Sequence, residues 1–214
     1  MRPFYSDIAS ALEHVEVEDH GYGSVAGYLG MAKQAPNGHA PRLIFIGNGG
    51  SAAIASHMAA DYQKNGGFSA ICFNDAAALT CISNDLGYEN VFSLPISHHG
   101  RFGDILFAIS SSGESDNILH AVDMAVGMNM NVVTLSGFKP YNRLRGRGGV
   151  NFYVPSMSYG VVEITQPGPD RVHARREPAR RAEQKVTVDE GGGRQPGRPG
   201  ERVGAQAVRR KEAS

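Results

Sequence analysis

The sequence predicts an α/β fold in which helices cover both faces of a parallel sheet. Short apolar runs typical of buried strands alternate along the chain with segments of helical periodicity. The chain has 214 residues, of which 41% are hydrophobic and 20% are charged, with 27 Gly and 11 Pro. This length and composition fit one globular domain with a substantial core, and they exclude collagen-like, mucin-like and wholly disordered chains.

The first elements are two helices, a strand and a third helix. Apolar residues recur at helical spacing from Phe4 to Val15, and a second helical stretch follows near residues 24–34. An apolar run at residues 42–46 predicts a short buried strand. Ser51 can cap the next helix, which we expect to extend to about residue 64.

The same alternation continues through the apolar part of the chain. We expect strands at residues 70–73, 104–109, 132–135 and 152–154, with helical segments between them such as residues 118–128. Strands that alternate with helices favour a parallel sheet, and such sheets bind ligands beyond the carboxyl ends of their strands. The sequence therefore predicts a site at that edge.

The composition changes abruptly after Gln166. Residues 167–214 contain no Ile, Leu, Met, Phe, Tyr or Cys, and Arg, Gly, Ala and Pro fill 28 of the 48 positions. They hold 12 basic and 7 acidic residues, against 9 basic and 14 acidic in residues 1–166. Such a segment buries too little apolar surface to offset its ordering entropy, so we expect a folded domain over 1–166 and a disordered tail over 167–214.

The tail has a second interpretation, a reading-frame error. In a shifted frame, the degenerate codons for residues 167–174 permit the series Leu-Ala-Leu-Ile-Ala-Phe-Met-His, and Gln and His codons share the stem CA at position 166. That series would continue the apolar helix that precedes it. We prefer this hypothesis over a genuine tail.

Targeting and redox features are few. Cys72 and Cys81 are the only cysteines, no apolar run approaches the roughly 18 residues of a membrane helix, and the N-terminus has no signal-peptide core. We expect a soluble cytoplasmic protein with neither a disulfide framework nor a bilayer span.

The first candidate site is the loop Gly47-Asn48-Gly49-Gly50-Ser51-Ala52. Here a strand passes through small residues into a helix N-terminus, whose free N–H groups and dipole favour an anion. A Walker loop is excluded because the lysine is missing, whereas the dinucleotide pattern is met by Gly47, Gly49 and Ala52, with Asp75 as its acidic residue. A tight turn that merely needs flexible residues is the alternative.

The second candidate is the serine loop Ser110-Ser111-Ser112-Gly113-Glu114-Ser115, again between a strand and a helix. Four hydroxyls and helix-terminal N–H groups suit a phosphomonoester, and a dinucleotide site has no role for them. Serines that only form a turn and a cap are the alternative. Two such loops in one parallel sheet favour phosphate binding.

Ionisable residues near these loops are candidates for catalysis. His57 and Asp61 are four residues apart, so they project from one helix face and could share a metal or a proton, or form an ordinary solvated pair. Asn84-Asp85, which we place in a polar break after residues 76–83, and Glu163, on a late apolar helix, supply further polar groups. The sequence does not establish that these residues converge.

Five segments follow one another in a characteristic order: GNGGSA (47–52), HMAAD (57–61), ISNDLGYENVFS (82–93), AISSSGESDNI (108–118) and VPS (154–156). Together they resemble a known family, the sugar isomerase (SIS) domain proteins, and within it the phosphoheptose isomerases that act on sedoheptulose 7-phosphate. The resemblance covers about residues 1–166. It implies a three-layer αβα sandwich around a five-stranded parallel sheet, and a homotetramer whose sites are shared between subunits.

The resemblance also implies residue roles. The substrate-binding set is Asn48, Gly49, Gly50, Ser51, Asn84, Asp85, Ser110, Ser111, Ser112 and Ser115, with the serines as the phosphate clamp. His57 matches a zinc ligand, Asp61 stands where the family has a glutamate base and ligand, and Glu163 stands where the phosphoheptose isomerases have a glutamine. We therefore expect Asp61 or Glu163 as the catalytic base, and one zinc ion held by His57, Asp61 and Glu163. A histidine that the family carries on its last helix has no counterpart here.

The expected activity is aldose–ketose isomerisation of a sugar phosphate, most simply of sedoheptulose 7-phosphate to D-glycero-D-manno-heptose 7-phosphate through an enediolate, for heptose supply to surface polysaccharide. The main alternative is a non-catalytic SIS protein that binds a phosphosugar as a regulator or adaptor. A dinucleotide enzyme is poorly supported. Nucleic-acid binding through the Arg-rich tail is not expected, because no aromatic residues are interleaved with its charges.

Overall fold

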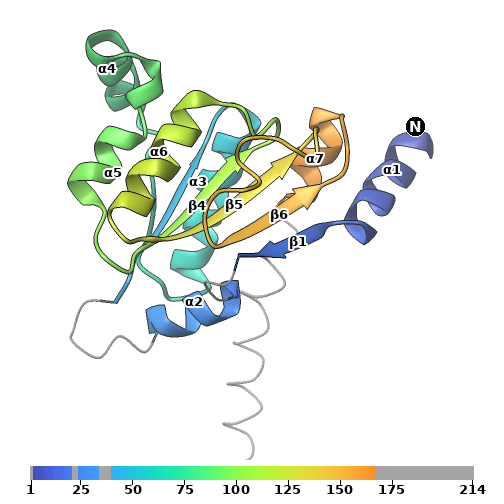
Figure 1. Ribbon diagram of the computed structural model, residues 1–214, viewed down its shortest axis with the longest axis horizontal. Coiled ribbons are helices and arrows are strands. Elements are labelled where there is room, and N and C mark those ends of the chain that lie inside the picture. The colour runs from blue at the N-terminus through green and yellow to red at the C-terminus, as the bar shows by residue number, and fades with distance from the viewer. Residues whose placement is uncertain (1, 21–23, 34–39, 167–214) are drawn as a thin grey trace, which may run out of the picture. The chain divides into compact units, whose positions relative to one another are not determined.

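A six-stranded sheet forms the centre of the chain in the computed structural model, which describes residues 2–20, 24–33 and 40–166 (Figure 1). The strand order is β1-β6-β5-β4-β2-β3. Five strands are mutually parallel, as expected: β2 (Leu43–Gly47), β3 (Ala70–Cys72), β4 (Ile105–Ser110), β5 (Asn131–Gly137) and β6 (Val150–Val154). The predicted strand count is one too low, because β1 (Glu16–Asp19) adds an antiparallel edge strand beside β6.

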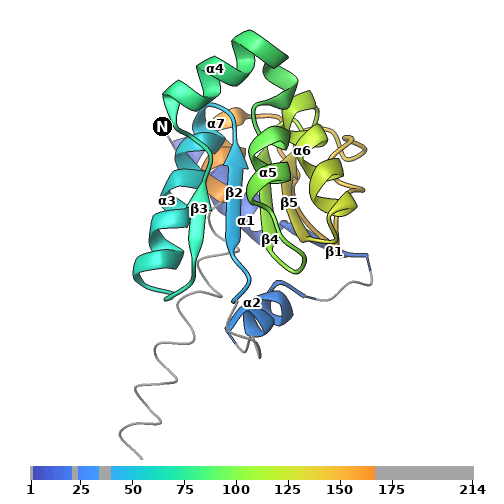
Figure 2. The ribbon, with the colours of Figure 1, turned by 90° about the vertical axis from the view of Figure 1, so that its left-hand side faces the viewer.

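Helices cover both faces of the sheet, which confirms the three-layer sandwich. Figure 2 shows α3 (Gly50–Lys64) on one side of β2 and both α5 (Ser93–His99) and α6 (Asp116–Gly127) on the other. Side chains alternate along β2 in the same way, with Phe45 in the core under α3 and Ile44 and Ile46 in the core under α5 and α6. Burying each of these large side chains stabilises the fold by about 1.5–3 kcal/mol.

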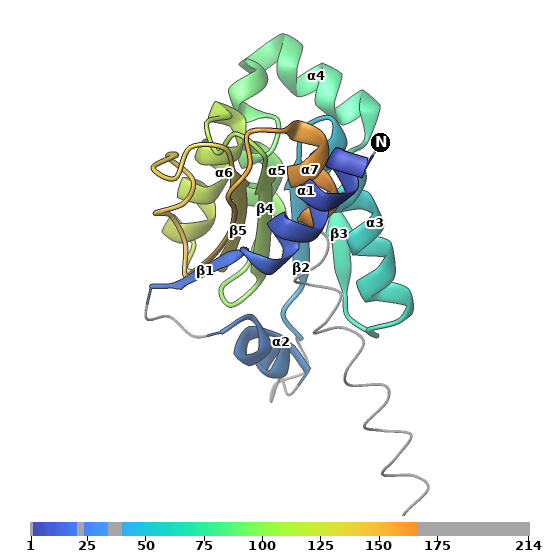
Figure 3. The same cartoon turned by 90° about the vertical axis from the view of Figure 1, so that its right-hand side faces the viewer.

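Three further helices complete the face that α3 covers. The helix α2 (Val25–Lys33) contributes Tyr28 and Leu29 to the core under α3. The helices α1 (Arg2–Glu13) and α7 (Tyr159–Thr165) pack against each other in a smaller cluster with Val154, and Figure 3 shows them side by side. This packing carries α7 to the carboxyl edge of the sheet, where it also contacts α3.

The helix α4 (Ala76–Leu86) corrects one expectation. Asn84 and Asp85 lie in its last turn and not in a polar break, and the helix ends at Gly87, whose φ is +89°. Asp75 caps its start by accepting a hydrogen bond from the Ala78 N–H over 2.8 Å, so the carboxylate has a local structural role. None of the residues of α4 is buried.

Both cysteines are free thiols. No helix in the described part of the chain is long and apolar enough to cross a bilayer. The expectations for residues 167–214 lie outside the described residues.

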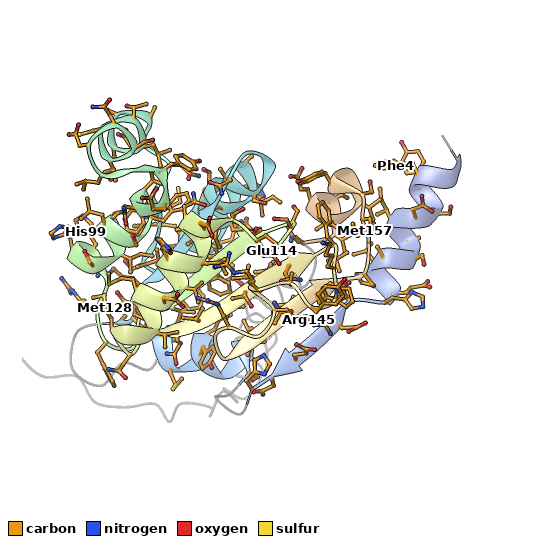
Figure 4. The ribbon with its side chains drawn as sticks, turned by 45° about the horizontal axis from the view of Figure 1, so that its top comes forward. Phe4, His99, Glu114, Met128, Arg145 and Met157 are labelled. Atoms are coloured by element: carbon orange, nitrogen blue, oxygen red, sulfur yellow. The ribbon has the colours of Figure 1, made fainter. Side chains whose placement is uncertain are left out.

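Arg145 holds the added strand β1 against the sheet (Figure 4). Its guanidinium donates to Glu16 over 2.5 Å and to Glu18 over 2.6 Å, and it lies 4.0 Å from the centroid of the Tyr153 ring. The side chain of Arg145 is only 13% exposed, so these partners replace most of its contact with water. The hydrogen bond from Arg145 lowers the pKa of Glu18 below its ordinary value of 4.5.

This ion pair predicts a pH dependence of stability. Because the pKa of Glu18 is lower in the folded state, its contribution is complete above pH 4.5 and is lost as the pH falls through the lowered value. The expected loss is about 0.5–1 kcal/mol, since the Glu18 side chain keeps 36% exposure to screening solvent. Urea midpoints of the wild type and Glu18→Gln, measured from neutral pH downward, should differ at neutral pH and converge in acid. A constant difference between them would contradict this role.

Candidate functional site

The two candidate loops lie side by side at the carboxyl edge of the sheet. The first connects β2 to α3, and the serine loop connects β4 to α6. The strands β2 and β4 are hydrogen-bonded neighbours, with Gly47 opposite Ile109. Each loop leads into a helix, and the first N–H groups of a helix have no partner within it. Two groups of backbone N–H donors, both suited to binding an anion, therefore lie next to each other at this edge of the sheet.

Glycines shape the first loop for two different reasons. Gly49 has a φ of +54°, a left-handed conformation that other residues adopt at a cost. Gly50 lies against the Glu163 carboxylate: a Cβ at Gly50 would lie 2.4 Å from Glu163 Oε2 and 2.6 Å from Oε1, so the carboxylate would have to move. The Glu163 carboxylate thus rests directly on the first residue of α3.

Because the Glu163 carboxylate contacts Gly50, the two loops differ in how well they suit a phosphate group. A carboxylate at the N-terminus of α3 interacts favourably with the helix dipole, and its charge repels a second anion from the same place. The serine loop and the first turn of α6 also carry two carboxylates, Glu114 and Asp116, but both accept hydrogen bonds from Arg143, one from its backbone N–H and one from its guanidinium. Of the two loops, the serine loop is therefore the better suited to a phosphate group.

The four serines differ in how much of their hydrogen-bonding capacity is free. The Ser110 hydroxyl accepts from the Gly113 N–H over 3.2 Å and lies 3.3 Å from the Ser115 hydroxyl. Ser111 is 5% exposed, and its hydroxyl is buried without a partner among the described residues. Ser112 accepts from the Glu114 N–H and, like Ser115, is half-buried. Ser112 and Ser115 are therefore the hydroxyls best placed to reach a ligand.

Two residues that the sequence analysis did not single out connect the loops. The side chains of Asn48 and Asn117 exchange two hydrogen bonds, each 2.9 Å long, and the Tyr88 hydroxyl donates to Asn48 Oδ1 over 3.0 Å. Asn117 and Tyr88 fall inside the family-like segments 108–118 and 82–93, which was the available signal. Asn48 and Tyr88 line a cleft of about 290 Å³ beside the first loop, together with Ser56 and Asn74.

His57 and Asp61 lie further along α3. His57 is exposed, and Asp61 accepts a hydrogen bond from the Asn65 side chain over 2.5 Å near the C-terminal end of the helix. At 1.5 Å per residue, Asp61 is about 16 Å along the helix axis from Gly50. The structure thus brings Glu163, but not Asp61, to the first loop.

The zinc ligand set is not assembled in the described part of the chain. No group of three or more His, Cys, Asp or Glu residues there is close enough to hold a metal ion. His57, Asp61 and Glu163 therefore do not by themselves fit a zinc ion, and zinc remains a prediction from the resemblance.

Asn84 and Asp85 remain apart from the cleft. Both are exposed on α4, and the Asn84 amide donates to Asp85 Oδ1 over 2.7 Å. The helix contributes Leu79 to the cleft lining, whereas Asn84 and Asp85 are not part of that lining.

Comparisons with known proteins agree with this architecture. The SIS domain family matches residues 4–137. The phosphoheptose isomerases of Klebsiella pneumoniae subsp. pneumoniae and Serratia proteamaculans are 40% and 42% identical over 123 residues, which are 55% of this chain and 63% of each relative. The chain thus matches less than two thirds of the length of these relatives.

A solved structure gives the same result at the level of the fold. The phosphoheptose isomerase GmhA from Neisseria gonorrhoeae superposes with a TM-score of 0.61 and 26% identity, over 81% of this chain and 85% of that one. The family match includes the first loop, the serine loop and the strands that place them. The chain therefore belongs to the SIS domain family.

Proposed function

We propose that the protein is a cytoplasmic aldose–ketose isomerase that converts sedoheptulose 7-phosphate to D-glycero-D-manno-heptose 7-phosphate. The observation that carries the proposal is the Glu163 carboxylate on Gly50, next to a serine loop suited to a phosphate. A base beside a phosphate anchor is what proton transfer within a sugar phosphate requires. Relatives named phosphoheptose isomerase at about 40% identity support this choice of substrate.

In the proposed mechanism, the Ser112 and Ser115 hydroxyls and the α6 N-terminus hold the phosphate. The Glu163 carboxylate removes a proton from C1 of the ketose, which gives the C1–C2 enediolate. The hydroxyl proton on O1 passes to O2, and the same carboxyl group returns its proton to C2, which leaves the aldehyde at C1. The N–H groups at the start of α3 stabilise the negative charge that develops on the oxygen. A zinc ion, if bound, would polarise the carbonyl, but the described residues do not assemble its ligands and no step here depends on it.

Proton exchange tests the activity directly. The full chain is incubated with sedoheptulose 7-phosphate in D₂O, with added zinc and separately with a chelator, and deuterium entering the substrate carbons is followed by NMR. Deuterium incorporation with formation of the aldose supports the proposal. Intact substrate in both conditions contradicts it.

The second candidate is a phosphosugar-binding SIS protein without catalysis. Two observations favour it: Asp61 is engaged by Asn65, and no metal-binding group is assembled among the described residues. Saturable binding of the sugar phosphate without deuterium exchange would select this function.

The proposed assembly is a homotetramer with shared sites. The exposed α4, which carries Asn84 and Asp85 away from the cleft of its own subunit, supports this arrangement, because these residues are free to complete the site of another copy. Light scattering after size-exclusion chromatography should give four times the chain mass. A monomer would leave Asn84 and Asp85 outside the site.

We also propose that the frame changes near Gln166. Gln166 is 1% exposed, and both polar atoms of its side-chain amide lack a partner among the described residues, which costs about 1–3 kcal/mol. A genuine residue at such a position is normally hydrogen-bonded. Sequencing the gene across codons 160–180 should reveal a single-base change, and an unchanged frame would reject the hypothesis.

The phosphate clamp predicts a selective loss of affinity. Ser115→Ala removes a hydroxyl from the serine loop, and a hydrogen bond to a charged group contributes about 1.5–3 kcal/mol, so affinity for the sugar phosphate should fall about ten-fold or more. Ser97→Ala is the matched control, because the Ser97 hydroxyl bonds only to its own helix at Leu94 O in the contacts described. Calorimetric titration with sedoheptulose 7-phosphate measures both variants. Equal affinities would place the phosphate elsewhere.

A further inference from the structure

The hydrogen bonds around Asn117 have a fixed direction. Asn117 is 3% exposed, and its Oδ1 accepts a hydrogen bond from the backbone N–H of Ile118 over 3.0 Å. A backbone N–H can only donate, so this contact identifies the Asn117 atom as the oxygen and leaves its Nδ2 group facing Asn48. The amide of Asn48 must then present Oδ1 to that group and Nδ2 to Asn117 Oδ1.

The orientation of Asn48 in turn fixes the Tyr88 hydroxyl. Asn48 Oδ1 is an acceptor, so Tyr88 must donate its only hydroxyl proton to it. The Tyr88 oxygen then has only lone pairs left. Tyr88 is 53% exposed and lines the 290 Å³ cleft, so these lone pairs are accessible to a ligand.

The Tyr88 oxygen is an accessible acceptor in this cleft, whereas the Asn74 oxygen is not. The Asn74 amide donates to Ala52 O and to the Ser56 hydroxyl, both over 2.8 Å, and Asn74 Oδ1 is buried without a partner among the described residues. An accessible acceptor oxygen repels the oxygens of a phosphate and suits a hydroxyl proton of a polyol. The second Nδ2 proton of Asn48 adds one donor, which an Asn side chain has to spare after a single bond to Asn117.

We propose that Asn117 is a positioning residue that, through Asn48, orients Tyr88 to accept a hydrogen bond from a hydroxyl group of the sugar chain. This proposal rests on the proposed function, since it assigns the cleft to the polyol part of the same sugar phosphate. It adds Tyr88 as a specificity-determining residue that recognises hydroxyl groups and not the phosphate.

The test compares two ligands on the full chain. Affinities for sedoheptulose 7-phosphate and for inorganic phosphate are measured by calorimetry for the wild type, Tyr88→Phe, Asn117→Asp and the double variant. The matched controls are Tyr141→Phe, at a side chain that is 80% exposed, and Asn131→Asp, at the first residue of β5, on the edge of the sheet away from the candidate site. Thermal midpoints are recorded for every variant to report folding.

Tyr88→Phe should weaken sugar-phosphate binding about three- to ten-fold and leave inorganic-phosphate binding unchanged, because one hydrogen bond to a hydroxyl is lost. Asn117→Asp removes the donor to Asn48 Oδ1 and should also weaken sugar-phosphate binding. Because its new carboxylate lies in the first turn of α6, it should weaken inorganic-phosphate binding as well, so the comparison of the two ligands is made on Tyr88→Phe. The double variant should lose no more than Asn117→Asp alone, because both changes interrupt one chain of hydrogen bonds.

Unchanged sugar-phosphate affinity in Tyr88→Phe would overturn the proposal, as would an equal loss for both ligands in that variant or additive losses in the double variant. If Asn117→Asp fails to fold, Tyr88→Phe decides, because Tyr88 is exposed. Turnover of the wild type is measured separately. If the wild type binds the sugar phosphate but does not isomerise it, the isomerase function is refuted and the affinity test of Tyr88 can still be made. If the wild type binds no sugar phosphate, both the isomerase function and the role of Tyr88 are refuted.

Discussion

Replacing Glu163 by Gln should lower kcat for isomerisation about 10²- to 10⁴-fold, the usual contribution of a general base. The substitution keeps the shape of the side chain on Gly50 and removes the group that accepts the proton. Because the phosphate is assigned to the serine loop, KM should change little. Steady-state rates and the rate of deuterium exchange at C1 should fall together.

Two further variants make this result specific. Glu13→Gln, an exposed position on α1, is the matched control and should retain wild-type rates. Asp61→Asn tests the other carboxylate that the sequence offers as the base. Should Asp61→Asn abolish exchange while Glu163→Gln retains it, the base would be Asp61. Retained exchange in both variants would remove both carboxylates from the mechanism.

The elements that the sequence predicts well are those with a strong local signal. The strands β2, β4, β5 and β6 are buried along their whole length except at the first residue of β5. Their side chains are therefore mostly apolar or small, with Asn131 and Asn151 as exceptions. The two candidate loops also have a local signal, since a strand, small or hydroxyl residues and a helix follow one another directly in the sequence. The fold class and the position of these loops were therefore predictable.

The edge strand β1 was not predicted, because its sequence carries no such local signal. Its sequence is Glu-Val-Glu-Asp and its side chains are mostly exposed, so no apolar pattern marks it. It pairs with β6 and is held by Arg145, more than 120 residues later in the chain. The polar break predicted at Asn84-Asp85 was wrong because the prediction relied on local helix propensity. Both residues are weak helix formers, yet α4 includes them and ends just before Gly87.

The candidate site also depends on tertiary contacts that have no local signal in the sequence. The Asn48–Asn117 pair joins residues 69 positions apart, and the contact of Glu163 with Gly50 depends on how α7 packs against α1 and α3. Neither follows from spacing along the sequence. The resemblance to a family supplied roles for individual residues, but the hydrogen-bonding direction at Tyr88 depends on tertiary contacts.

Gly50→Ala should reduce kcat by about two orders of magnitude, even though alanine is the better helix former. The added Cβ would lie 2.4 Å from Glu163 Oε2, so the carboxylate must move away from the loop. Gly30→Ala is the matched control, because Gly30 also lies in a helix and a Cβ there meets nothing within 4 Å. That variant should keep its rate and gain up to about 1 kcal/mol of stability.

A double-mutant cycle separates the steric cause from any general effect of Gly50→Ala. In the wild-type background the substitution should stabilise the protein less than the helix propensity of alanine predicts, because the Glu163 carboxylate must move away from the added Cβ. In a Glu163→Ala background the clash is absent, and the same substitution should stabilise the protein by several tenths of a kcal/mol. The resulting coupling energy should be about 0.5–3 kcal/mol, as for residues in contact. Equal effects in both backgrounds would mean that Glu163 does not rest on Gly50 in solution, and the assignment of Glu163 as the base would lose its structural ground.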